Sequence, residues 1–413
     1  MRLTWLRKFG YADNLFSGIR PLIIILYLNG LAPFCLIGRD KLVIAKSGFL
    51  FSLAYFICYI ITYSTTLARG QTIIGYFLNN EISKVGNVIE MTTSPFEVIT
   101  CGLYCLYRRK ELLSCMEILS LVDYRLKLLG VKFNYNYLLF YGYLLSVGLF
   151  IFSFTYLIVG YIVLKLSGVN PAFEVFGLFC MSNIEIVVVV LAFISITKLL
   201  EYRFKMLNRV TLVCVIHKFK FIRIPILSTK ISPANIIREV TNIHNLLHDS
   251  CRLGEKYFSY QMLVIITVSF LFIIFDDYYI LDILLTTRNI KPKFNVDTFV
   301  IFLTSQMFLY SLMIIAIVES SSRTIEQELA IHVHKLLQRT TDKDVEDKLN
   351  KFSMQLIHRK VRFSAGGLFY LDRTFIFTLA GSITTYLVIL LQFGNSSDNG
   401  DTCCASGNCT NLN

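Results

Sequence analysis

Long apolar runs separated by polar, basic segments dominate the pattern of this chain. Seven of these runs are long enough to cross about 30 Å of hydrocarbon as α-helices. Of the seven, the second is the weakest, because Glu90, Pro95 and Glu97 interrupt it. The pattern therefore predicts an all-α polytopic membrane protein with seven transmembrane helices. The runs span residues 48–67, 85–106, 137–164, 173–197, 262–285, 298–318 and 374–393.

A further apolar stretch, residues 21–37, is interrupted by Asn29, Gly30 and Pro33. Its polar lead is long for a signal peptide, and no small-residue cleavage site follows it. Because the apolar run is short and broken, we interpret it as an amphipathic or re-entrant element on the inner membrane surface.

Two polar segments between the runs have helical periodicity of their own. Residues 198–261 are helical in pattern at both ends, with Pro225 and Pro233 breaking the middle. Residues 319–366 predict two amphipathic helices. Two interpretations of these helices stay open, namely packing within one subunit and a cytoplasmic oligomerisation hub. The apolar positions of the second segment are Ile325, Leu329, Val333, Leu336, Val345, Leu349, Phe352 and Leu356.

The pair His332 and His334 lies in the first of these two helices. Positions two residues apart on a helix point to different faces, so the two imidazoles cannot easily share a metal ion. A solvated helix face is the favoured interpretation, and we predict no metal site.

Composition and charge support a membrane protein and orient it. The chain has 413 residues, of which 55% are hydrophobic and 16% charged, which is more apolar surface than one soluble core can bury. The net charge of +12 therefore does not indicate a nucleic-acid partner. With seven spans, 34 of the 40 Lys and Arg residues fall on one side. The positive-inside rule places that side and the N-terminus in the cytoplasm, and the C-terminus outside.

This topology divides the chain into seven regions. They are a cytoplasmic N-terminal region (1–47), four transmembrane helices (48–197), a cytoplasmic helical loop (198–261), two further transmembrane helices (262–318), cytoplasmic anchor helices (319–373), a last transmembrane helix (374–393) and an extracellular tail (394–413). The tail holds two glycosylation sequons, at Asn395 and Asn408. It also holds Cys403, Cys404 and Cys409, an odd number that cannot all pair within the tail.

No arrangement of residues typical of catalysis is found. The sequence has no His-Glu-x-x-His, no Gly-x-Ser-x-Gly and no phosphate-binding glycine loop. We therefore expect neither an enzyme nor a bound cofactor.

Polar side chains inside the apolar runs are costly and need a reason. Counting 1.5 Å of rise per residue places several of them roughly 8–18 Å below the outer ends of five spans. Such a layer of hydrogen-bonding groups and aromatic rings predicts a small-molecule pocket that opens outward. The alternative is that these groups pair with one another across helices. The candidate ligand-binding residues are Glu90, Tyr156, Glu185, Asp276, Asp277, Tyr278 and Gln306.

The seventh run differs from the others. It has no charged residue between Thr374 and Phe393, and Gly381, Thr385, Ile389 and Gln392 recur at helical spacing. If several copies surround an axis, Gln392 forms a polar ring at the outer mouth, and Ile389 or Val388 forms an apolar constriction. The alternative is a seam between two helices.

One motif in this run resembles a known signature. Thr385-Tyr386, five apolar residues and then Gln392-Phe393 give the pattern Thr-Tyr-x5-Gln-Phe, which resembles the signature of insect gustatory receptors. The longer stretch from Gly366 to Phe393 is similar to the final-span pattern of that family. The segment IGYFLNN at 74–80 is similar more loosely.

The resemblance implies a homotetrameric, ligand-gated, non-selective cation channel for tastants, in the plasma membrane of chemosensory neurons. It implies that the seventh helices line the pore, with Gln392 at its mouth and Tyr386 and Phe393 packing the helix in place. The remaining helices would hold the ligand pocket, and the inner extensions would form an anchor domain. The implied partners are a small-molecule tastant, membrane lipid, permeating cations, and copies of this chain or other gustatory receptor subunits.

Leu387 stands where receptors of the sugar clade usually carry Glu, so we expect a member outside the canonical sugar-receptor clade. Bitter compounds, nucleosides, a non-canonical sugar and a thermal or light stimulus stay open as the stimulus. The alternative function is a seven-helix chemoreceptor of the G-protein-coupled type without a pore. That alternative requires the opposite orientation, and the last run lacks an Asn-Pro-x-x-Tyr motif.

Overall fold

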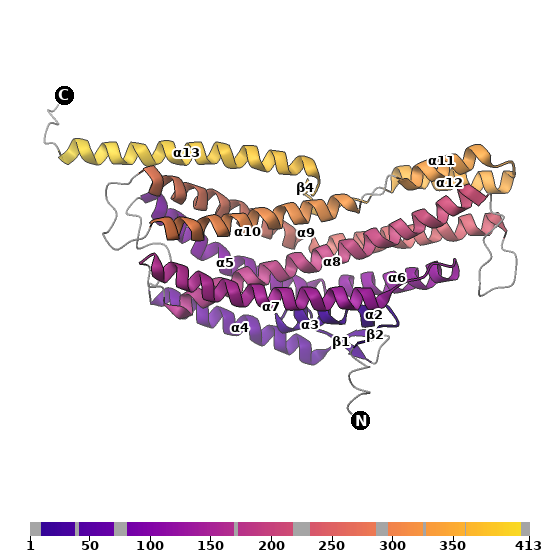
Figure 1. Cartoon of the computed structure of the whole chain (residues 1–413), viewed down its shortest axis with the longest axis horizontal. Helices are drawn as coiled ribbons and strands as arrows, with labels where there is room; N and C mark the ends of the chain where they lie inside the picture. The colour runs from indigo at the N-terminus through magenta and orange to yellow at the C-terminus, as the bar shows by residue number, and fades with distance from the viewer. Residues whose placement is uncertain are drawn as a thin grey trace.

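The computed structural model describes residues 10–37, 41–69, 81–168, 172–217, 232–285, 296–324, 328–359 and 361–405. Nearly all of them are helical, and the helices lie side by side along one long axis (Figure 1). Each of the seven predicted runs falls inside one long helix. These helices are α4 (Lys46–Ala68), α5 (Glu81–Tyr107), α7 (Tyr135–Leu166), α8 (Phe173–His217), α9 (Pro233–Leu285), α10 (Val296–Arg323) and α13 (Arg373–Ala405).

Among the described residues, six of these helices, all except α5, are long and apolar enough to cross a membrane. The carboxyl groups of Glu90 and Glu97 lower the hydropathy of α5, and Pro95 lies within it. The chain is thus a multi-pass helical membrane protein. The crossing by α5 stays a prediction.

The two longest helices extend well beyond a bilayer. Helices α8 and α9 contain 45 and 53 residues, or about 68 and 80 Å at 1.5 Å per residue, against about 30 Å of hydrocarbon. At one end they pack with α6 (Arg109–Leu128), α11 (Glu328–Arg339) and α12 (Lys343–His358) (Figure 1). The long helices therefore connect the apolar half of the molecule to a second, more polar half.

Helices α11 and α12 confirm the amphipathic pattern of the sequence. Their apolar side chains are buried against each other, α8 and α9, within one chain. This contact supports packing within the subunit and leaves the oligomerisation hub untested. Of the eight apolar positions predicted there, Ile325 lies outside the described residues. The fully buried ones are Leu329, Val333, Leu336, Val345, Leu349 and Phe352.

The surroundings of the two histidines of α11 match the prediction of a solvated helix face only in part. His334 is exposed, but His332 is half-buried, with Nδ1 2.6 Å from Oδ1 of Asn208 on α8. His332 thus lies at a helix contact rather than on a solvated face. In the part of the chain that the structure describes, no group of three or more His, Cys, Asp or Glu side chains is placed to hold a metal ion.

The N-terminal stretch 21–37 does not form one continuous helix. It begins as α3 (Arg20–Leu28), which at nine residues is too short to cross a bilayer, and ends as strand β1 (Phe34–Ile37). Strand β1 pairs antiparallel with β2 (Lys41–Ile44), with Phe34 opposite Ile44. A short helix, α2 (Leu15–Gly18), precedes α3. These strands were not predicted, because the broken apolar pattern gave no strand signal, but the structure remains nearly all helical.

A second hairpin links α12 to α13. Strands β3 (Ser364–Ala365) and β4 (Phe369–Tyr370) pair antiparallel, and Gly366 and Gly367 make the turn with φ of +60° and +74°. The N–H of Gly366 donates to the carbonyl of Ser259 on α9. Only glycine adopts such positive φ angles at little cost, so the turn fixes the direction in which α13 leaves the more polar half of the molecule.

We expect Gly367→Ala to destabilise the protein by about 1–2 kcal/mol, the cost of a side chain in the left-handed region. An added Cβ at Gly367 would meet no atom within 4 Å, so the effect comes from the backbone alone. Gly148→Ala on α7 is the matched control, because its Cβ also meets nothing and its backbone is helical. Thermal unfolding in detergent measures both variants. Equal melting temperatures would show that this turn does not have the left-handed conformation.

The end of the last helix also differs from the prediction. Helix α13 continues to Ala405, beyond the predicted end of the span at residue 393. The side chains of residues 394–405, including Asn395, Cys403 and Cys404, are not described, and Asn408 and Cys409 lie outside the described residues. The segment at 74–80 and Pro225 lie outside them as well, whereas Pro233 is the first residue of α9.

Candidate functional site

Two buried carboxyl groups meet between α5 and α9. Asp276 on α9 is completely buried, and neither of its carboxylate oxygens has a hydrogen-bond partner among the described residues. Glu90 on α5 is buried close enough to interact electrostatically with Asp276. Tyr156 of α7 packs against the aromatic residues that flank Asp276, and its buried hydroxyl has no hydrogen-bond partner among the described residues. Unpaired polar groups at this depth are costly, which makes the cluster a candidate ligand site.

The two neighbours of Asp276 in the predicted site differ in burial. Tyr278 is 1% exposed and belongs to the buried aromatic cluster, whereas Asp277 is half-buried. Two adjacent helical positions point about 100° apart, so the two carboxylates face different surroundings. Asp276 is therefore the carboxylate that enters the cluster.

Helix α10 adds an amide and a phenol to this region. Gln306 is 1% exposed, and its amide finds no hydrogen-bond partner among the described residues. One turn later, Tyr310 donates to Oδ1 of Asn183 on α8 at 2.6 Å and stacks on Phe272 of α9 with ring centroids 4.9 Å apart. Tyr310 was missed in the sequence. Its spacing of four residues from Gln306 was the available signal.

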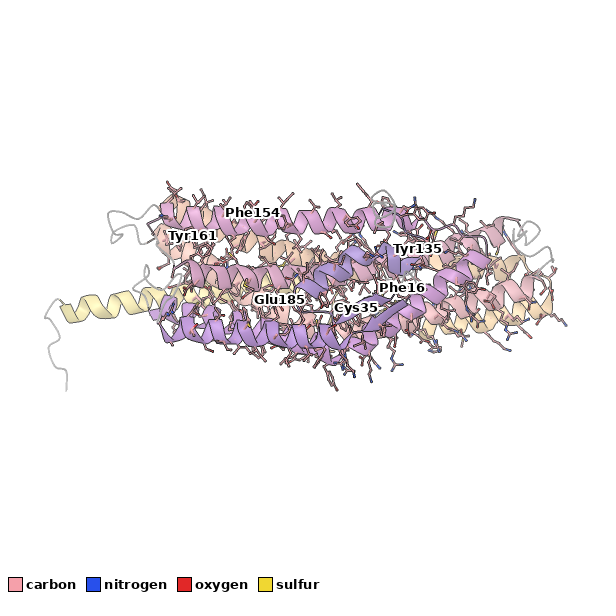
Figure 2. The ribbon with its side chains drawn as sticks, turned by 90° about the horizontal axis from the view of Figure 1, so that it is seen from below. Phe16, Cys35, Tyr135, Phe154, Tyr161 and Glu185 are labelled. Carbon is pink, nitrogen blue, oxygen red and sulfur yellow. The ribbon has the colours of Figure 1, made fainter. Side chains whose placement is uncertain are left out.

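Glu185 lies with a different carboxyl group. It is 2% exposed on α8, and it interacts with Glu97 of α5, which is 1% exposed. Nearby, the hydroxyls of Tyr59 and Ser182 are 2.7 Å apart and join α4 to α8. Figure 2 shows Glu185 in the middle of the bundle and Phe154 on its outer edge. The predicted layer therefore contains two acidic pairs, and the sequence reasoning did not include Glu97 in the site.

The space beside these groups is small in this conformation. A cavity of about 30 Å³ is lined by Glu90, Ser182 and Phe302, among others. This volume holds about one water molecule. Two larger cavities, of about 370 and 360 Å³, lie elsewhere, one beside the β3–β4 hairpin and one between α3, α7 and α8. A ligand larger than a water molecule would therefore fit beside these carboxyl groups only if the helices moved apart.

Helix α13 has one packed face and one exposed face. Leu379, Ile383, Leu387, Leu390 and Leu391 pack against the buried clusters of the bundle, and the helix contacts α9 and α10. The stripe predicted from the sequence lies on the other side and is exposed in the single chain. That stripe consists of Gly381, Thr385, Val388, Ile389 and Gln392.

The motif aromatics on α13 do not share one environment. Tyr386 is 53% exposed and makes an edge contact with Phe270 of α9, with ring centroids 5.9 Å apart. Phe393 is 64% exposed near the end of the span. The hydroxyl of Thr385 donates to the carbonyl of Gly381 on its own helix at 2.9 Å. Its hydrogen-bonding capacity is thus met locally, which lets the residue face either lipid or a water-filled path.

Charged side chains form an ion pair and hydrogen bonds at the start of α13. Arg373 donates to both carboxylate oxygens of Glu319 at the end of α10, at 3.1 and 3.2 Å. Asp372 accepts from the N–H groups of Thr374 and Phe375, and the Thr374 hydroxyl also donates to it. These hydrogen bonds hold the pKa of Asp372 below its usual range, so the carboxylate stays charged at the positive end of the helix dipole. Helix α13 therefore begins at a fixed point beside α10.

Comparison with known sequences gives one consistent result. The sequence profile of the family described as 7tm chemosensory receptor matches residues 19–396. Gustatory receptor 28a of Drosophila melanogaster is 35% identical, over 98% of this chain and 96% of its own length. Gustatory receptor 28b of the same species is 32% identical, over 97% of this chain and 92% of its own length.

A solved structure has the same fold. The insect olfactory receptor OR5 from Machilis hrabei aligns with a TM-score of 0.60, covering 91% of this chain and 97% of its own. Its complex with eugenol aligns with a TM-score of 0.57. The sequence identity is 13% in both cases, so this likeness concerns the fold alone.

Proposed function

This chain belongs to the insect gustatory receptors of the 7tm chemosensory receptor family, and on that basis we propose that it forms a homotetrameric, ligand-gated, non-selective cation channel for tastants. The family membership makes it a chemoreceptor in a membrane and supports the role of a receptor rather than an enzyme. In the proposal it lies in the plasma membrane of chemosensory neurons. Copies of this chain, or other gustatory receptor subunits, complete the channel.

The exposed face of α13 carries this proposal. The face of a transmembrane helix that contacts only lipid is usually uniformly apolar. The exposed face of α13 instead has Gly381, Thr385 and Gln392 in line. Four such faces around an axis form a narrow path with hydroxyl, apolar and amide rings in succession. Ile389 and Val388 provide the apolar ring, and Gln392 the polar one.

In the proposed topology, all seven long helices cross the membrane, with the N-terminus inside. The two acidic pairs and Tyr310 then lie in the outer half, where they receive the tastant. The extensions of α8 and α9, with α11 and α12, form the cytoplasmic anchor. The tail after residue 393 is extracellular, and Asn395 and Asn408 are its glycosylation candidates.

Excised outside-out patches test the channel directly. Cells expressing the chain are first screened with tastant panels, and the active compound is then applied to excised patches bathed in solution without GTP. An intrinsic channel still conducts there, whereas a receptor that acts through G proteins loses its response. Tags at both ends, stained on intact cells, test the orientation, and external access to the N-terminus would contradict it.

We expect Asp276→Asn to raise the half-activating concentration by about tenfold or more, because charged hydrogen bonds contribute about 1.5–3 kcal/mol. The substitution keeps the shape of the side chain. Asp297→Asn, at an exposed position in the first turn of α10, is the matched control and should change the response little. Dose–response curves measure the effect. If Asp276→Asn and Asp277→Asn both respond like the control, the tastant binds elsewhere.

A further inference from the structure

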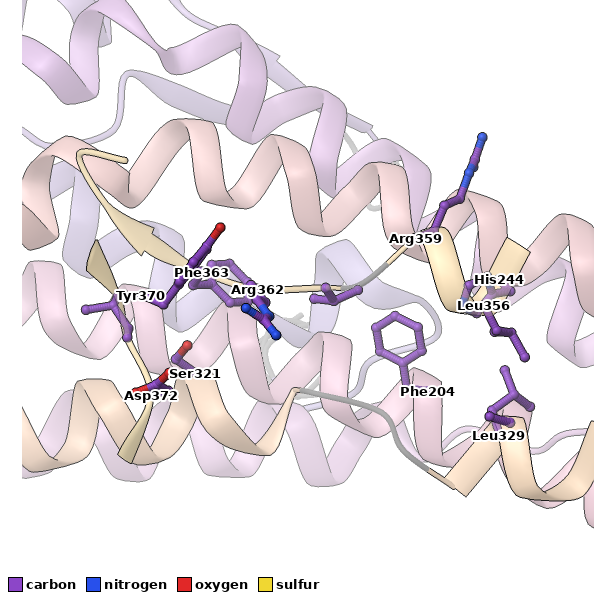
Figure 3. Close-up of a pocket in the computed structure, with 13 residues that line it drawn as sticks. Phe204, His244, Ser321, Leu329, Leu356, Arg359, Arg362, Phe363, Tyr370 and Asp372 are labelled. Atoms are coloured by element: carbon purple, nitrogen blue, oxygen red, sulfur yellow. The ribbon is translucent and has the colours of Figure 1, made fainter. Parts of the chain in front are cut away.

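A cavity of about 370 Å³ lies where the β3–β4 hairpin meets the inner parts of α8 to α12 (Figure 3). We call it the hairpin cavity and define it by Phe204, His244, Ser321, Leu329, Arg362 and Asp372, which line it. It is remote from the acidic pairs, since Asp276 follows His244 on α9 by 32 residues, or about 48 Å of helix. Its volume falls in the range of small-molecule sites.

One end of the hairpin cavity is apolar. Phe204 and Leu329 are buried there, and Leu356 lies beside them (Figure 3). His244 lines this end with only 4% of its surface exposed, and its Nδ1 has no hydrogen-bond partner among the described residues. Burial lowers the pKa of His244 to about 4, with smaller effects from His248 and Arg359. The imidazole is therefore neutral at pH 7 and can hydrogen-bond to a guest.

The other end carries positive charge. Arg362 extends into the space beside Asp372 and Ser321, and its guanidinium carbon lies 5.1 Å from the ring centroid of Tyr370 (Figure 3). Arg359 also lines the cavity, although its side chain points away in this structure. Asp372 stays charged beside Arg362 and offsets one of the two arginines, so these three lining residues together keep one net positive charge.

We propose that the hairpin cavity binds a phosphate monoester that has an apolar portion. The guanidinium of Arg362 matches phosphate oxygens in a bidentate manner. Arg359, whose Nη1 donates to Oδ1 of Asn245 at 3.1 Å in this structure, would add a second positive charge by turning toward the cavity. The Ser321 hydroxyl supplies a further donor, and the apolar portion lies against Phe204 and Leu329. Such a guest is either the headgroup region of an anionic lipid or a free organic phosphate.

The test measures binding by thermal stabilisation of the purified full-length protein, without any current. Octyl phosphate should raise the melting temperature in detergent, whereas inorganic phosphate at the same concentration should not, because it lacks the apolar portion. Nanodiscs containing dioctanoyl phosphatidate are compared with phosphatidylcholine nanodiscs. Stabilisation by phosphatidate identifies a lipid as the guest, and stabilisation by octyl phosphate alone identifies a free ester.

Three variants assign the effect to the cavity. Arg362→Gln should weaken octyl phosphate binding at least about tenfold, the loss of one charged bidentate contact. Ala330→Phe should abolish binding by filling the cavity from its half-buried rim. Arg252→Gln, at an exposed position on α9 outside the cavity, removes the same charge and should bind like wild type. The proposal is overturned if octyl phosphate stabilises no better than inorganic phosphate, or if all three variants bind alike.

Discussion

Replacing Arg203 with Met should destabilise the protein by about 3–5 kcal/mol, the usual cost of leaving one partner of a buried ion pair uncompensated. Arg203 on α8 and Asp123 on α6 are 2% and 4% exposed. Nε and Nη2 of the guanidinium donate to the two carboxylate oxygens at 2.9 and 2.8 Å. Nη1 donates to the carbonyl of Leu199, and the Tyr135 hydroxyl donates to Asp123 at 2.9 Å. The network thus joins three helices and satisfies both charges.

Equilibrium unfolding in detergent and surface expression measure this effect. Arg323→Met is the control, because its pair with Glu319 is exposed and screened by solvent, so its loss should change stability little. The double variant Arg203→Met with Asp123→Leu should recover much of the lost stability, since no buried charge is then unpaired. If Arg203→Met unfolds no more readily than Arg323→Met, the buried pair does not hold α6 and α8 together.

Replacing Ile389 with Ala should raise the agonist-independent current on the order of tenfold, because a wider apolar constriction stays wet more easily. Gln392→Ala should instead change single-channel conductance or relative cation permeability, since its amide would face the permeating ion. The half-activating agonist concentration should move much less in both variants, because the acidic pairs lie on other helices.

Patch-clamp recording of well-expressed channels provides the measurement. Val159→Ala is the control, a β-branched residue 50% exposed on α7, where a truncation should leave all three quantities unchanged. If both α13 variants match this control in resting current, conductance and selectivity, the exposed stripe is a seam between helices. The pore assignment would then be wrong.

Membrane depth along each span predicted Glu90, Asp276 and Gln306 as parts of one ligand site, and this site stays a prediction. The structure shows that all three side chains are buried within the chain. The depth of a residue along its span does not show, however, which way its side chain points around the helix axis. The sequence reasoning grouped Glu185 with Asp276 and left out Glu97, which interacts electrostatically with Glu185. It also left out Tyr310, although a spacing of four residues from Gln306 places both on one face of α10.

The sequence alone determined the helical spans, because hydrocarbon demands about 20 apolar residues with every backbone group paired, and such runs are visible in the chain. It also determined the stripe on α13 and the apolar faces of α11 and α12, since a helix fixes which residues share a face. Only the tertiary structure decided which face each helix turns inward. It alone showed the Arg203–Asp123 pair, the two acidic pairs and the hairpin cavity, because each forms between residues far apart in the sequence.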